Sequence, residues 1–151
     1  MSPEVTGVDQ LARQTAALIK PLLEAGGLAG AVFDSVVTGM RPARYAVFNL
    51  ARVIGSGRLT SVDEQADWLL TVQAIGGADR DDPNAIDHAV DQARWVQAVA
   101  IRQLLGTRIH PPGWTSTPVR HADGQPVDWD TSATPPLAYA VDSFRWKSDK
   151  Q

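Results

Sequence analysis

The stretch LLTVQAIGGADRDDPNAI, residues 69 to 86, decides how the chain is built on either side of it. Its first residues are mostly apolar or β-branched and predict a buried strand that ends at Gly76 and Gly77. An acidic loop follows. Asp82 and Pro83 then predict the start of a helix, because aspartate caps free backbone amides and proline suits the first helical position. The stretch therefore predicts a strand that leads through a short loop into a helix.

Two long elements flank this loop. Residues 66 to 77 alternate along a strand that we expect to be central, and residues 84 to 105 carry apolar side chains at helical spacing. The helix face expected on the sheet comprises Ile86, Ala89, Val90, Ala93, Gln97, Ala100 and Leu104, with Val96 and Ile101 beside it. Trp95, Val99 and Arg102 are expected on the opposite side, where a large aromatic indicates a further partner. The alternative is that the C-terminal segment covers Trp95 within the same subunit.

The segment before the central strand predicts one helix and two further strands. Residues 8 to 24 carry one apolar stripe at helical spacing, in which Pro21 predicts a kink or an early end. Residues 29 to 39 are short and β-branched, and residues 44 to 53 alternate, so each of the two predicts a strand. The glycine-rich residues 55 to 64 predict a long flexible hairpin loop.

The C-terminal part differs in composition from the rest. Residues 109 to 136 form a proline-rich extended segment, in which proline excludes a central strand or a long helix over most of the length. Within it, Asp123 and Gly124 predict a tight hairpin between two short strands. Residues 136 to 149 alternate and predict a closing strand. The elements together predict a single α+β domain over residues 1 to 151, a mainly antiparallel sheet with two helices on one face and an extra C-terminal β-hairpin.

Composition restricts the classes of function. The sequence is 44% hydrophobic and 21% charged, as globular domains are, and it has no apolar run that would span a membrane. It contains no cysteine, which excludes disulfides, thiolate metal sites and cysteine nucleophiles. A formal net charge of −3 disfavours a surface that grips nucleic acid, although an acidic wall lets nucleic acid pass. The first ten residues lack a signal-peptide pattern, so we expect synthesis in the cytoplasm.

The acidic loop lacks the pattern of a known ligand-binding motif. Residues 76 to 84 have neither the lysine nor the third glycine of a phosphate loop, and their aspartates would repel phosphate. Oxygen atoms of Asp79, Asp81 and Asp82 leave weak binding of a hard cation open. Pro83, however, stands where an EF-hand loop needs a ligand, and interaction with the helix N-terminus alone explains most of these acids.

The remaining titratable and nucleophilic residues predict no catalytic, cofactor or metal site. His88, His110 and His121 lie far apart in the sequence and have no metal-ligand spacing. The serine in the GSG of residues 55 to 57 has no strand-to-helix turn of the kind that a nucleophile elbow requires.

The element order and two segments resemble the tail terminator, or tail completion, proteins of long-tailed bacteriophages. The strand WLLTVQAIGG and the alanine-rich helix AIDHAVDQARWVQAVAIRQLL carry this resemblance. RYAVFNL, residues 44 to 50, occupies the place of a PYxVF-like segment, with Arg44 where the family pattern often has proline. The resemblance covers residues 8 to 110 in element order, and residues 109 to 136 match least.

This resemblance implies a structural virion protein that is not an enzyme. Six copies would form a ring that ends polymerisation of the tail tube, between the tube protein and a neck or connector protein. DNA would pass nearby without specific binding, and the protein, made in the host cytoplasm, would act in the tail or neck of the virion. Candidates for the subunit interface, on the outer helix face, are Trp95, Val99 and Arg102. Candidates for a channel lining or partner loop, all acidic, are Asp79, Asp81 and Asp82.

Two other functions are compatible with these patterns. A head-closure or adaptor protein of the neck would show more β-barrel or more helical character. A small-molecule-binding or enzymatic α+β module would share the element order and would hold a pocket between sheet and helix. Monomeric behaviour with a saturable ligand pocket would favour the second of these.

Overall fold

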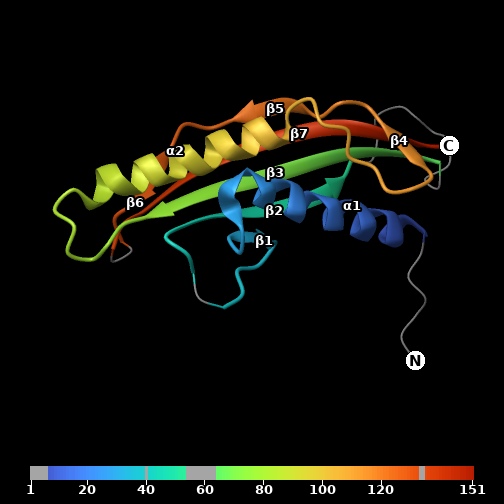
Figure 1. The fold of residues 1–151 in the computed structure, drawn as a ribbon. Coiled ribbons are helices and arrows are strands. Elements are labelled where there is room, and N and C mark those ends of the chain that lie inside the picture. Colours follow the sequence, from blue (N-terminus) through green and yellow to red (C-terminus); the bar gives the residue numbers. More distant parts are fainter. Residues whose placement is uncertain (1–6, 40, 54–63, 133–134) are drawn as a thin grey trace.

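The computed structural model describes residues 7–39, 41–53, 64–132 and 135–151 (Figure 1). In chain order the elements are α1 (Gly7–Leu23), the π-helical turn η1 (Glu24–Leu28), β1 (Val32–Asp34), β2 (Arg44–Arg52), β3 (Gln65–Gly77), α2 (Ala85–Leu104), β4 (Trp114–Ser116), β5 (Arg120–Gly124), β6 (Asp128–Asp130) and β7 (Leu137–Lys150). The hairpin loop expected over residues 55 to 64 lies outside the described residues, apart from Glu64.

The described strands form one mixed sheet of seven, with the main order β1-β2-β3-β7-β4 and with β5 and β6 also paired to β7. β3 is antiparallel to β2 on one side and to β7 on the other, which confirms its expected central position. β1 is the parallel exception, beside β2. It is shorter than the strand expected over residues 29 to 39, because the chain turns at Ser35, whose φ of 66° is incompatible with a strand. The α+β class with a mainly antiparallel sheet is confirmed.

β4, β5 and β6 are three pieces of one interrupted edge. They pair in turn with successive parts of β7, from its C-terminal to its N-terminal end. Pro118 and Pro126 lie in the two gaps between the pieces, because proline cannot donate a ladder hydrogen bond. The hairpin predicted at Asp123 and Gly124 is therefore wrong, since β5 and β6 both pair with β7 instead of with each other. A longer hairpin, between this edge and β7, replaces it.

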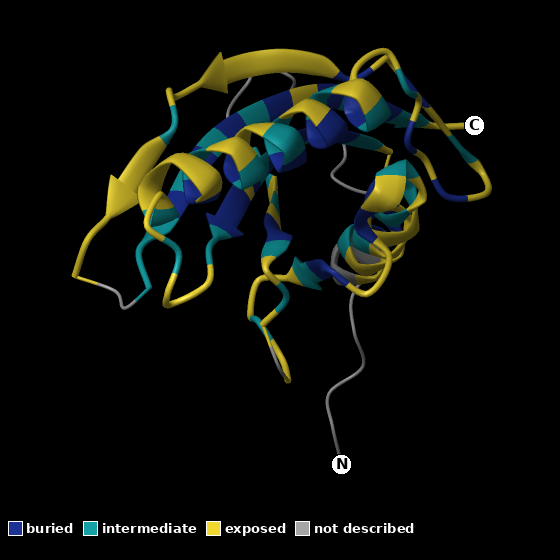
Figure 2. Cartoon of the chain, turned by 60° about the vertical axis from the view of Figure 1, so that its left-hand side comes forward, coloured by how far each residue is buried: buried dark blue, intermediate teal, exposed yellow. Residues whose placement is uncertain are grey.

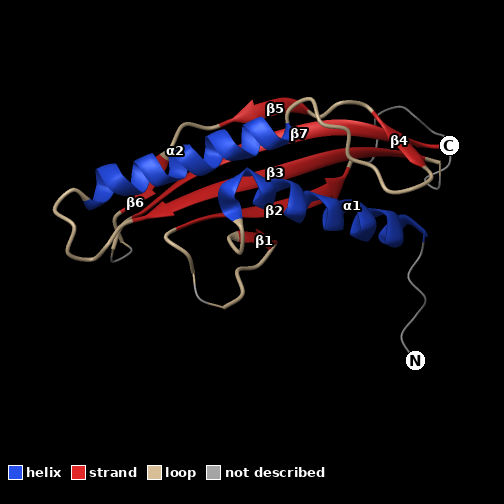
Figure 3. Ribbon diagram, viewed as in Figure 1, coloured by secondary structure: helices blue, strands red, loops and turns tan. Residues whose placement is uncertain are grey.

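Both helices lie on one face of the sheet, as predicted (Figure 3). α2 runs along β3 and β7, while α1 packs beside β1 and β2 and contacts α2. The buried side chains between the layers alternate along the strands, so that on β3 they are Ala66, Trp68, Leu70, Val72 and Ala74. Figure 2 shows the buried residues gathered between α2 and the sheet, whereas β5 and β6 are exposed throughout.

α1 confirms the first predicted helix but continues past the expected break. The helix includes Pro21, ends at Leu23 and passes directly into η1. Within η1 the chain leaves helical geometry at Gly27, whose φ of 114° suits glycine. Leu18, an apolar residue of this helix, is 39% exposed. Among the described residues, the structure has no helix that is long and apolar enough to cross a membrane.

α2 confirms the second predicted helix, with two corrections. It begins at Ala85 after the N-cap residue Asn84, two residues later than Pro83 would start it. Its buried face includes Val99, which is 1% exposed and was expected to project outward. The reason is η1, which packs beside α2 so closely that a Cβ on Gly26 would lie 2.7 Å from Val99 Cγ1.

Candidate functional site

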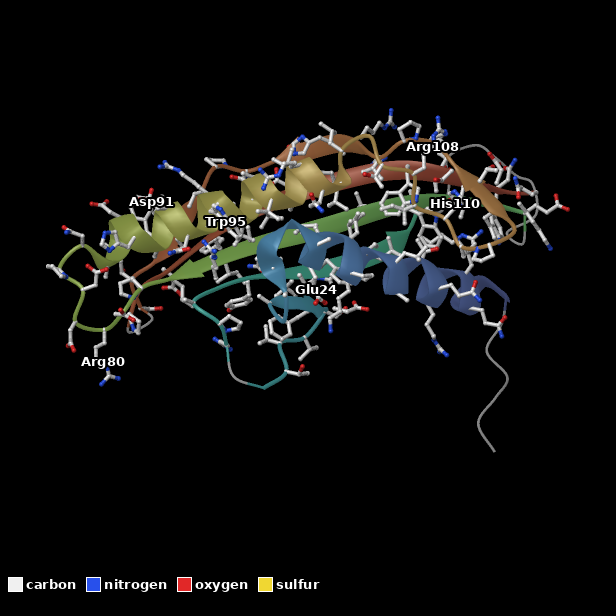
Figure 4. All side chains as sticks on the ribbon, in the orientation of Figure 1. Glu24, Arg80, Asp91, Trp95, Arg108 and His110 are labelled. Atoms are coloured by element: carbon white, nitrogen blue, oxygen red, sulfur yellow. The ribbon has the colours of Figure 1, made fainter. Side chains whose placement is uncertain are left out.

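Trp95 of α2, expected on the outer side of the helix, is half-buried and lies toward β2 and η1 (Figure 4). The Arg44 guanidinium of β2 lies 3.5 Å from the centroid of the Trp95 ring, a cation–π contact. Arg44 Nη1 also donates a hydrogen bond to Gln92 Oε1 at 3.3 Å. A Cβ on Gly27 of η1 would also lie 3.1 Å from the ring. Trp95 is therefore covered within its own chain by Arg44 and η1. The alternative stated from the sequence expected the C-terminal segment to cover it.

The three residues expected at a subunit interface differ from one another in how far they are buried. Val99 is buried inside the chain, so its assignment to the outer surface is wrong. Trp95 is half-buried and Arg102 is exposed near the C-terminal end of α2. These two side chains retain surface for a neighbouring molecule, and their interface role stays a prediction.

The turn between β3 and α2 holds the predicted acidic residues. Asp79 and Asp81 are exposed, whereas Asp82 is partly buried. The Asp82 carboxylate accepts a hydrogen bond from the backbone N–H of Asn84 at 2.8 Å and forms an ion pair with Nδ1 of His88. Asp82 thus holds the turn just before the helix and does not cap it at the expected position. In the described part of the chain no group of three or more His, Cys, Asp or Glu is placed to hold a metal ion.

The Asp82–His88 pair shifts the acidity of both partners. The backbone hydrogen bond from Asn84, followed by the hydrogen bond with His88, lowers the pKa of Asp82 below its ordinary value of 3.8. The hydrogen bond with Asp82, followed by the charge of Asp82, raises the pKa of His88 above its ordinary value of 6.5. The Asp82 contribution to stability is therefore lost as pH falls through its lowered pKa, and the His88 contribution as pH rises through its raised pKa.

We expect His88 to titrate above 6.5 in an NMR pH titration, and Asp82→Asn to lower its midpoint toward 6.5, because the carboxylate stabilises the imidazolium. A His88 midpoint that is the same in both proteins would contradict the ion pair.

A buried polar cluster lies on the helix-facing side of β7, where sequence reasoning assigned no function. Asp142 is 4% exposed. Gln97 Nε2 of α2 donates a hydrogen bond to Asp142 Oδ2 at 2.8 Å, and His121 Nε2 of β5 lies 2.7 Å from Asp142 Oδ1. The edge of the His121 ring also contacts the ring of Phe144, at 5.4 Å between centroids. The signal in the sequence is a single carboxylate in the otherwise apolar row of alternate residues from 140 to 146.

The cluster connects α2, β5 and β7 through hydrogen bonds to one carboxylate, so its geometry indicates a structural role. A histidine beside a buried carboxylate also occurs in hydrolytic triads, but there a nucleophile must bond to the histidine. Among the described residues, no serine or threonine hydroxyl forms a hydrogen bond with His121. Asp142 instead connects the exposed strand β5 to the sheet and to α2, which fixes the position of the edge.

Comparisons with known proteins establish the fold. No family model matches the sequence, and no curated protein matches it. The structure is similar to a chain in the virion of a native gene transfer agent particle, with a TM-score of 0.54 and 14% identity over 93% of this chain and 92% of that one. A second solved structure gives a TM-score of 0.52 and 14% identity over 90% of this chain and 92% of that one. The chain therefore shares its fold with these proteins over nearly its whole length.

Proposed function

We propose that the chain is a structural protein of a phage-like virion. The observation that carries this proposal is the similarity of fold to a chain of a gene transfer agent virion, which extends over 93% of the chain. A similarity that extends over 93% of this chain and 92% of the other is more informative than one confined to a common substructure.

Within such a virion we propose the role of a tail terminator. The resemblance of residues 8 to 110 to tail terminator proteins supports this position. Six copies form a ring at the end of the tail tube, prevent the next tube subunit from adding, and present a second surface to the neck or connector protein. The mechanism is geometric, and no residue acts as a catalyst.

The sheet face opposite the two helices, on which no described helix packs, supports an assembly role. Because both helices occupy one face, alternate residues of the long strands point to the other, and on β3 these are Leu69, Thr71 and Gln73. The same face of β7 carries Val141 and Ser143, which are partly exposed. A ring subunit needs two different surfaces for its two neighbours and further surface for its axial partners.

The acidic turn and the outer side of α2 have specific places in this proposal. Asp79, Asp81 and Asp82 face either the channel or a partner, and an acidic channel wall repels phosphate so that DNA slides without binding. Trp95 and Arg102 are the surface residues of α2 that we assign to the contact between neighbouring subunits.

The first test is the mass of the purified protein across a concentration series, measured by native mass spectrometry and light scattering. We expect a hexamer, or a monomer that becomes one on concentration. The second test adds the protein to tube protein from the same particle while tubes assemble, and we expect shorter tubes by electron microscopy. A strict monomer that leaves tube length unchanged would contradict the tail terminator role and favour a binding module.

A further inference from the structure

A cluster of positive charge lies on the sheet face opposite the helices. Arg120 of β5 and Arg145 of β7 are direct cross-strand partners. Lys147 follows two residues after Arg145, and its cross-strand partner on β3 is Asp67. Side chains alternate along a strand, so Arg145 and Lys147 point away from the buried Phe144 and Trp146. We call Arg120, Arg145 and Lys147 the basic cluster.

The cations of the basic cluster are not held in ion pairs within the described part of the chain. Like charges directly opposite each other destabilise an antiparallel pair, so Arg120 and Arg145 weaken the strand pairing that holds them. In the described ranges, three acidic residues lie near the cations on the same face: Asp67 opposite Lys147, Asp149 two residues beyond Lys147, and Asp123 opposite Ser143. The cluster borders a pocket of about 330 Å³, which is also lined by Asp67 and by Thr117 and Pro118 of the interrupted edge.

The opposite charge is found at the other end of the same strands. Asp79 and Asp81 in the turn after β3, and Asp87 in the first turn of α2, are exposed, and none of them forms an ion pair among the described residues. We call these three residues the acidic end. Strand β3 rises roughly 33 Å between Asp67 and Gly77 at about 3.3 Å per residue. The two charged regions of one molecule therefore cannot reach each other (Figure 1, Figure 4).

We propose that the basic cluster of one copy binds the acidic end of the next copy. This inference rests on the proposed ring, because a ring of identical chains requires a contact between two different patches, one at each end of the subunit. Arginine suits such a contact, since its guanidinium binds carboxylates through two parallel hydrogen bonds. The pocket beside the cluster accepts the aspartate side chains. Asp79 and Asp81 then act as the partner loop and not as the channel lining.

The test is a charge swap in the full chain, read as the mass in solution over a concentration series. Arg145→Glu and Asp81→Arg are each expected to raise the dissociation constant of the assembly by about tenfold or more, because each places like charges together at the contact. The double variant is expected to recover assembly toward the wild-type level. Arg13→Glu, on the exposed side of α1, changes the net charge equally and is expected to leave assembly unchanged.

The outcomes separate this contact from the ring itself. If the wild-type protein and both single variants assemble equally well, the proposed contact is overturned. The proposed ring is not affected by that result. Wild-type protein that stays monomeric at every concentration would overturn both. If Arg145→Glu fails to fold, Arg145→Gln tests the same contact by removing the charge, and unchanged assembly would overturn it. Assembly that depends on added duplex DNA, with no recovery in the double variant, would overturn it in favour of a nucleic-acid contact.

Discussion

Replacing Gly76 with alanine is expected to force α2 away from the sheet. A Cβ at this position would lie 2.3 Å from the carbonyl oxygen of Ala89 and 2.4 Å from the backbone nitrogen of Ala93. Both atoms belong to the backbone of α2, so they cannot move unless the helix shifts. We expect the free energy of unfolding, measured by urea titration at one fixed concentration, to fall by about 3 kcal/mol or more, at or above the upper end of the usual overpacking range.

Gly77 provides the matched control. A Cβ there would lie 3.4 Å from Leu137 Cδ2 and 3.5 Å from the carbonyl oxygen of Ala43, which are ordinary contact distances. Alanine changes the entropy of the unfolded chain similarly at the two neighbouring positions, so the difference between Gly76→Ala and Gly77→Ala isolates the helix contact. Equal losses in the two variants would show that α2 does not approach β3 this closely.

Removing the carboxylate of Asp142 is expected to release the outer edge of the sheet. Asp142→Ala leaves the Gln97 amide without its acceptor and removes the partner of His121. A polar group left unsatisfied in a buried site costs about 1–3 kcal/mol, so we expect a loss of about 3 kcal/mol in the free energy of unfolding. Hydrogen exchange should also accelerate at the amides of β5, because the side-chain tie to α2 is lost.

Two variants make this result specific. Asp142→Asn keeps one acceptor oxygen and is expected to lose less stability than the alanine variant. Asp128→Ala removes an exposed carboxylate that accepts a hydrogen bond from the backbone N–H of Trp129, and we expect a much smaller effect. If Asp142→Ala were no more destabilising than Asp128→Ala, the buried cluster would not hold the edge.

The edge that Asp142 supports also affects how copies of the chain can associate. An open edge strand is a template for pairing with another strand, and proteins avoid this with proline, bulges and short strands. Here the outer edge is divided by Pro118 and Pro126 and carries an irregularity between His121 and Asp123. Addition of strands across this edge is therefore disfavoured, which is consistent with a closed assembly formed through side chains.

The sequence by itself determined the long elements. Residues 66 to 77 alternate so regularly that the strand could be assigned without the fold, and β3 confirms it. The extents of α1 and α2 were also predicted to within a few residues, because the spacing of apolar side chains along one segment already states which face is buried. The α+β class follows from the order of these segments.

Tertiary structure alone decided which segments meet. Asp123 and Gly124 favour a tight turn locally, but the strands on either side of them pair with β7 instead. Strand pairing adds stabilisation at every residue pair, whereas the turn preference contributes at a single position. Val99 is buried because η1 happens to pack beside it, and Asp142 is satisfied by groups far from it in the sequence. Periodicity describes each segment separately, whereas burial and charge pairing depend on neighbours that only the folded chain brings together.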